Sequence, residues 1–69
     1  MFKIELIRGP SWEEPAETVD WRECHTESIA AAVAEARYWL IRTQTEQPHR
    51  GATHYRVVGE AGVVVGGPP

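Results

Sequence analysis

The sequence predicts an α+β fold in which one long α-helix packs on an antiparallel sheet of three or four strands. Three observations predict it: alternating apolar residues at 2–8, one alanine-rich helical segment at about 27–45, and two short β-branched runs after it. Alternation favours a strand with one buried face, and apolar spacings of three and four favour a helix. The expected order is strand, strand, helix, strand, strand, which buries one sheet face against the helix.

Two strands are expected before the helix. Phe2, Ile4 and Leu6 alternate with charged residues, and Gly9-Pro10 ends this run because proline cannot donate to a β-ladder. The acidic segment 11–17 contains a proline and is expected to be a loop. In the segment 18–24, Val19 and Trp21 share one face of the second expected strand.

The helix is expected to run from about Glu27 to Thr45. Thr26 is the expected N-cap, and Glu27 falls in the first turn, where the helix dipole favours a negative charge. Pro48 lies beyond the expected end. The expected buried stripe steps by four, three and four residues, and Ala32 broadens it; its members are Ile29, Val33, Ala36 and Leu40.

Two strands follow the helix. In the run 53–58, Tyr55 and Val57 are expected to point inward, with His54, Arg56 and Val58 on the other face. The glycines of segment 59–62 suit a tight turn, and Val63–Val65 forms the last expected strand. Residues 1–65 are therefore one domain, and 66–69 are a flexible Gly/Pro tail. The expected core is Phe2, Ile4, Leu6, Val19, Trp21, Ile29, Val33, Ala36, Leu40, Tyr55, Val57 and Val65.

Composition narrows the class of protein. The chain has 69 residues, of which 42% are hydrophobic and 25% charged, the proportions of one small globular domain. A single cysteine forms no internal disulfide. The N-terminus is interrupted by charge and lacks the apolar run of a secretory signal, and the apolar stretches are far below membrane length. A cytoplasmic location with no membrane contact is expected.

The helix carries more large apolar residues than one sheet can cover. Tyr38-Trp39-Leu40-Ile41 point in four directions around the helix; Leu40 continues the buried stripe, and Trp39 can flank it. The small residues beside them leave a smooth outer face for another chain. The alternatives are that the loop with Trp12 folds over this surface, or that Tyr38 is simply exposed, as single apolar residues often are. The candidate interface with a second copy or a larger protein consists of Ala31, Ala34, Tyr38, Trp39 and Ile41.

The second half of the chain is basic although the whole is acidic. Residues 1–36 hold three basic and eight acidic side chains, whereas residues 37–69 hold four arginines and two glutamates. The net charge of −3 argues against a nucleic-acid partner. A candidate basic patch nevertheless consists of Arg37, Arg42, Arg50 and Arg56. Ion pairs of Arg56 with Asp20 or Glu5 would argue for a solvated sheet face instead.

Metal, cofactor and catalytic chemistry find little support. Cys24 and His25 are adjacent, so their side chains point to opposite faces of a strand, and His49 and His54 lie beyond the helix. No spacing matches a ligand set, and no phosphate loop is present. Cys24 has no evident base or oxyanion hole, so the chain is expected to be no enzyme, with no catalytic, metal or cofactor residues.

Parts of the sequence resemble short uncharacterised bacterial proteins with a strand–helix–strand layout. The segments that carry this resemblance are Ala34-Glu35-Ala36-Arg37, His54-Tyr55-Arg56-Val57-Val58 and Gly62-Val63-Val64. The resemblance implies the fold and transfers no activity. The sequence identifies no specific function. It favours a small non-enzymatic protein-interaction or self-associating domain, and the alternative is a nucleic-acid-binding accessory domain that uses the four arginines.

Overall fold

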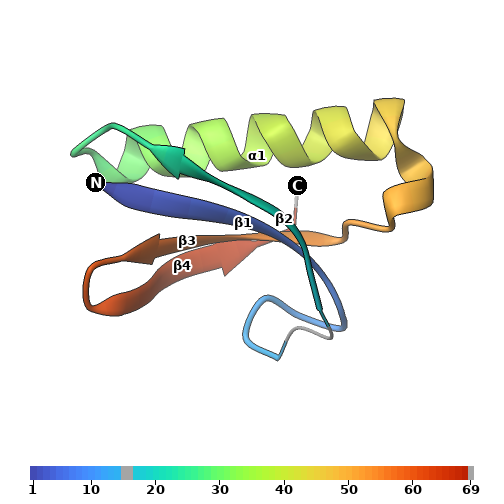
Figure 1. Ribbon diagram of the computed structural model, residues 1–69, viewed down its shortest axis with the longest axis horizontal. Helices are drawn as coiled ribbons and strands as arrows, with labels where there is room; N and C mark the ends of the chain where they lie inside the picture. The colour runs from blue at the N-terminus through green and yellow to red at the C-terminus, as the bar shows by residue number, and fades with distance from the viewer. Residues whose placement is uncertain (15–16, 69) are drawn as a thin grey trace.

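The predicted α+β fold class is confirmed. The computed structural model describes residues 1–14 and 17–68, and in them a four-stranded antiparallel sheet is covered on one face by one long helix (Figure 1). The sheet has the strand order β2-β1-β3-β4, and the helix follows β2 in the chain. The elements are β1 Phe2–Arg8, β2 Glu17–Cys24, α1 Ile29–Glu46, the 3-10 helix η1 Pro48–Arg50, β3 His54–Gly59 and β4 Gly62–Gly67.

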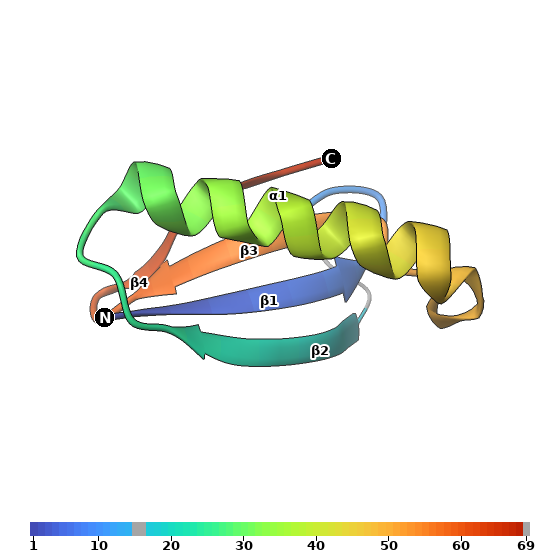
Figure 2. The same cartoon turned by 90° about the horizontal axis from the view of Figure 1, so that it is seen from above.

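The helix α1 lies over the two central strands, β1 and β3 (Figure 2). Its buried residues are Ala32, Ala36, Leu40 and Thr43, which are spaced by four, four and three. The alanines bring the helix backbone close to the sheet, and Leu40 supplies the largest fully buried side chain of the helix. From the sheet, Ile4, Leu6, Cys24, Tyr55 and Val57 join the same apolar cluster.

The helix begins two residues later than the sequence indicates. The N-cap is Ser28, whose hydroxyl accepts a hydrogen bond from the Ala31 backbone N–H at 3.2 Å. The predicted cap, Thr26, instead accepts a hydrogen bond from the Ser28 backbone N–H. Both residues suit an N-cap, and the segment before Ser28 is used as the connection from β2. Glu27 therefore precedes the helix.

Trp21 is not a core residue. It is 56% exposed and lies opposite Glu5 in the β1–β2 ladder. Leu6 faces Asp20 but Ile7 faces Thr18, so Val19 is an extra residue in a β-bulge. Val19 contacts the core. After the bulge, the alternation of side chains between the two sheet faces is reversed, so Trp21 lies on the face away from α1. A one-residue insertion reverses the two faces of a strand.

Ile29 is also not a core residue, since it is 47% exposed. It is the first residue of α1, next to the exposed cap Ser28, and burial begins one turn later at Ala32. Six expected core residues are buried, namely Ile4, Leu6, Ala36, Leu40, Tyr55 and Val57. Phe2, Val19, Val33 and Val65 are partly buried against them. The buried side chains of Ile7, Cys24, Ala32 and Ala52 were not in the expected core.

The last strand extends beyond the expected domain end. Gly66 and Gly67 pair with Arg56 and Tyr55, so the expected tail from residue 66 begins too early. The turn before β4 is tight, and Gly62 holds a φ of 124°, which favours glycine. Pro69, in the rest of the expected tail, lies outside the described residues, as do Pro15 and Ala16 of the expected loop.

The segment after β1 lies on the sheet face opposite α1 (Figure 1). On this face the Trp12 indole packs directly on Gly66, so Trp12 does not fold over the outer surface of the helix. Ile7, which alternates with the core residue Leu6, is fully buried on the same face. One end of this face is therefore covered, and the end with Trp21 is left exposed.

Candidate functional site

The two edges of the sheet differ in charge. β2 carries Glu17, Asp20, Arg22 and Glu23, and charged side chains on an edge strand discourage pairing with another chain. β4 has the sequence Gly-Val-Val-Val-Gly-Gly and carries no charge. In the described chain β4 pairs with β3 alone, so its outer edge is open to another strand.

The apolar side chains of β4 are accessible. Val63 is 47% exposed and Val64 is 43% exposed. A bulge at Val64, between the partners of Val57 and Val58, bends the strand without introducing a charge. Valine has a high preference for strands, so the segment is already suited to β-pairing. The open edge of β4, residues Gly62–Gly67, is the candidate association site.

The residues of the predicted helix interface do not all lie on the same side of α1. Ala31, Ala34, Tyr38 and Ile41 are exposed on the outer side of α1, with Tyr38 at 61% and Ile41 at 46%. Trp39 turns toward the sheet instead and is partly buried against the core. The Arg22 guanidinium from β2 lies 4.3 Å from the centre of its ring. The outer helix face thus stays a predicted interface without Trp39.

The four arginines of the predicted basic patch do not lie together. Arg56 is on β3, on the face away from α1, and binds the Glu5 carboxylate at 2.6 Å. Arg50 lies in η1 and contacts Asp20 at 3.2 Å. On the helix, Arg42 binds Glu46 at 3.2 Å, and Arg37 is exposed. Arg42, Arg50 and Arg56 bind carboxylates, and Arg56 lies on the sheet face away from α1, so the four guanidinium groups form no continuous track for a phosphate backbone.

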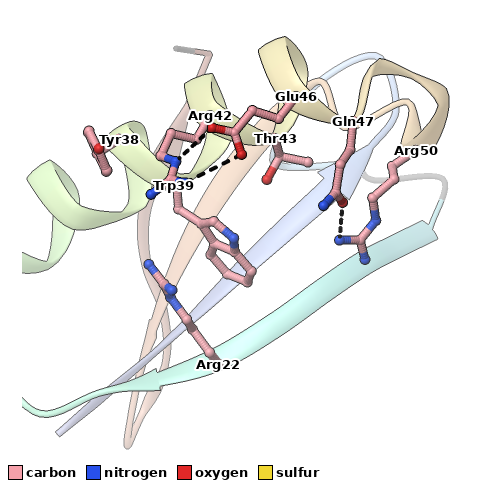
Figure 3. A pocket seen from close by; sticks show the side chains of 8 residues that line it. All are labelled: Arg22, Tyr38, Trp39, Arg42, Thr43, Glu46, Gln47 and Arg50. Carbon is pink, nitrogen blue, oxygen red and sulfur yellow. Dashed lines mark hydrogen bonds and ion pairs between the residues drawn. The ribbon is translucent and has the colours of Figure 1, made fainter.

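A hollow of about 250 Å³ brings together two of the four patch arginines and two of the five interface residues that the sequence predicts. It lies between β2 and α1, and Figure 3 shows the side chains around it. This arginine hollow is lined by Arg22, Tyr38, Trp39, Arg42, Thr43, Glu46, Gln47 and Arg50. Tyr38, Trp39, Arg42 and Arg50 were singled out in the sequence. Arg22 was not singled out in the sequence, because the bulge in β2 decides which face of the sheet its side chain takes.

The face of the sheet opposite α1 is built around Glu5. Its carboxylate is buried and receives hydrogen bonds from Arg56 and an ion pair from Lys3 at 3.2 Å. Burial alone would raise the pKa of Glu5, but the hydrogen bonds from Arg56 and Lys3 outweigh burial and lower this pKa below its ordinary value of 4.5.

Glu5→Gln is expected to weaken the acid sensitivity of folding. Because the folded chain holds the Glu5 proton less tightly than the unfolded chain does, this carboxylate stabilises the fold above pH 4.5. That contribution is lost as pH falls through the lower folded pKa. The free energy of unfolding, measured with urea from neutral pH down through this range, should fall more steeply for the parent chain than for Glu5→Gln. The exposed Glu23→Gln variant is the control, and an identical slope for Glu5→Gln and the parent would contradict the argument.

Cys24 and the histidines are not assembled into a site. Burial raises the pKa of the Cys24 thiol, and its hydrogen bond to Glu35 raises it further, so the nucleophilic thiolate is disfavoured. His25 is exposed beside Glu23, His49 lies in η1, and His54 contacts Thr53. Among the residues that the structure describes, no three His, Cys, Asp or Glu side chains come together as metal ligands.

Comparison with known proteins does not indicate a function. The chain matches no protein-family model, no curated protein and no solved structure. Within residues 1–14 and 17–68, no helix is both long and apolar enough to cross a membrane.

Proposed function

We propose that this chain is a small non-enzymatic domain that acts by self-association, in which β4 of one copy pairs with β4 of a second copy. The observation that carries the proposal is the open edge of β4, which has no charged residue, whereas β2 at the opposite edge has four. Unpaired N–H and C=O groups on an exposed apolar edge are a template for another strand.

A second copy fits this edge because β4 can pair with an identical strand. Two identical strands that pair antiparallel are related by a two-fold axis, so one sequence supplies both sides. The chain has a net charge of −3, and β4 lets two copies meet without like charges along the paired strands. The product is a continuous eight-stranded sheet with both helices on one face.

The same edge also suits a strand from a larger protein, and the outer helix face offers a different surface. One experiment distinguishes pairing through β4 from pairing through the helix face. Sedimentation equilibrium at tens of micromolar compares the parent chain with two variants that each add one positive charge at an exposed position. Val63→Lys alters the β4 edge, and Ala34→Lys alters the outer face of α1.

The proposal predicts a dimer for the parent chain and for Ala34→Lys, and a monomer for Val63→Lys. A parent chain that is strictly monomeric over this range refutes self-association. A dimer that is lost in Ala34→Lys and kept in Val63→Lys moves the interface to the helix and contradicts the assignment to β4. Circular dichroism of each variant verifies that the fold is intact.

A further inference from the structure

The arginine hollow concentrates positive charge in an acidic chain. Three of its eight lining residues are arginines, and one, Glu46, is acidic. Arg22 rises toward the hollow from β2, whereas Arg42 reaches it from α1 and Arg50 from η1 (Figure 3). Asp20 contacts Arg50 and adds a second carboxylate to that of Glu46. Two carboxylates and three guanidinium groups leave one excess positive charge.

Two of the three arginines are already held by partners in the chain. Arg42 donates to both carboxylate oxygens of Glu46, at 3.2 and 3.4 Å. Arg50 donates to the Gln47 side chain at 3.1 Å and to the Val19 carbonyl at 3.2 Å, in addition to its ion pair with Asp20. These bonds fix the guanidinium groups in place around the hollow.

Arg22 differs from Arg42 and Arg50 in its contacts. Among the described residues it makes no ion pair, and its guanidinium lies over the Trp39 ring at 4.3 Å. Stacking uses the flat face of a guanidinium and leaves the N–H donors at its edge free to bind an acceptor. Two parallel N–H donors match the oxygens of a carboxylate or a phosphate group. Arg22 therefore brings to the wall of the hollow a guanidinium group that makes no ion pair among the described residues.

We infer that the arginine hollow binds an oxyanion, the carboxylate or phosphate group of a small ligand, with Arg22 as its principal donor. The volume of about 250 Å³ lies below the roughly 300–1,000 Å³ of sites for drug-sized ligands, so the ligand is small. Trp39 offers aromatic surface to the rest of the ligand (Figure 3). This inference is independent of the pairing of β4, which lies at the other end of the strand order.

The test follows the arginine side-chain N–H signals and the Trp39 indole N–H signal by NMR. Inorganic phosphate and acetate are titrated separately at constant ionic strength, into the parent chain, Arg22→Gln and Arg37→Gln. Arg37 is the matched control, because it is an exposed arginine that does not line the hollow. Arg22→Lys is added as a second variant, which keeps the charge without the double donor.

We expect saturable shifts of the Arg22 and Trp39 signals in the parent chain and in Arg37→Gln, with a dissociation constant in the millimolar range. Affinity should fall at least tenfold in Arg22→Gln and to a smaller degree in Arg22→Lys. Saturation by phosphate alone identifies a phosphate ligand, and saturation by acetate alone identifies a carboxylate. Shifts that stay linear for both anions, or that are equal in Arg22→Gln and Arg37→Gln, overturn the inference.

Discussion

Leu40→Ala is expected to destabilise the fold strongly and to lower its unfolding temperature. Leu40 is fully buried between α1 and the sheet, and removing a buried leucine side chain costs about 2–5 kcal/mol. A domain of this length has a free energy of unfolding of about 3–10 kcal/mol. The substitution therefore removes at least about a fifth of this stability, and all of it where the parent chain lies at the lower end of the range. Thermal unfolding followed by circular dichroism measures the loss.

The adjacent residue supplies the control. Ile41 is 46% exposed on the outer side of the same helix, so Ile41→Ala should change the free energy of unfolding by no more than about 0.5 kcal/mol. Equal losses for Leu40→Ala and Ile41→Ala would mean that the helix packs on the sheet through a different face from the one described.

Gly66→Ala is expected to destabilise the end of the sheet, although alanine is the smallest possible addition. A Cβ atom at Gly66 would lie 2.6 Å from Cγ of Trp12 and 2.7 Å from the backbone oxygen of Tyr55. The Tyr55 oxygen belongs to the paired strand β3 and cannot retreat without disturbing the ladder. Overpacking of this kind costs about 1–3 kcal/mol. Urea unfolding monitored by tryptophan fluorescence measures the cost.

A double-mutant cycle with Trp12→Ala separates the two contacts. If the indole accounts for part of the cost, Gly66→Ala should destabilise the Trp12→Ala chain less than it destabilises the parent. The same cost in both backgrounds would assign the whole effect to the backbone of β3. A Gly66→Ala chain as stable as the parent would contradict the packing of Trp12 on β4.

The fold was largely predictable because most of its elements follow local patterns. Phe2, Ile4 and Leu6 alternate over one face, and the helix buries Ala36 and Leu40 as its spacing requires. The alternation of Tyr55 and Val57 was equally regular. These patterns depend on residues a few positions apart, so they are visible in the sequence.

The sequence predictions were wrong where a single residue changes the alternation of a strand, or where two residues both suit the same position. The bulge at Val19 places Trp21 on the outer face, and no local signal distinguishes it from a continuous strand. Thr26 and Ser28 both suit a cap, and the path of the chain from β2 selects Ser28. The burial of Gly67 depends on its pairing with Tyr55, a residue twelve positions away.

The candidate sites were less predictable because they join distant segments. The sequence singled out Trp39 as an interface residue and Arg42 as part of a basic patch, but the fold places both beside Arg22 in one hollow. That Arg56 would pair with Glu5 was an open alternative, and this pairing is confirmed at 2.6 Å. The helix interface of Ala31, Ala34, Tyr38 and Ile41 stays a prediction, as does the resemblance to small bacterial proteins.

The most direct test of β4 self-pairing is an isotope-filtered NOE experiment on an equal mixture of labelled and unlabelled chains. Signals selected in this way arise between copies. The account predicts intermolecular contacts between backbone protons within Gly62–Gly67, since paired antiparallel strands lie about 5 Å apart. Intermolecular contacts confined to Tyr38 and Ile41 on the helix, or none at concentrations where a dimer sediments, would contradict it.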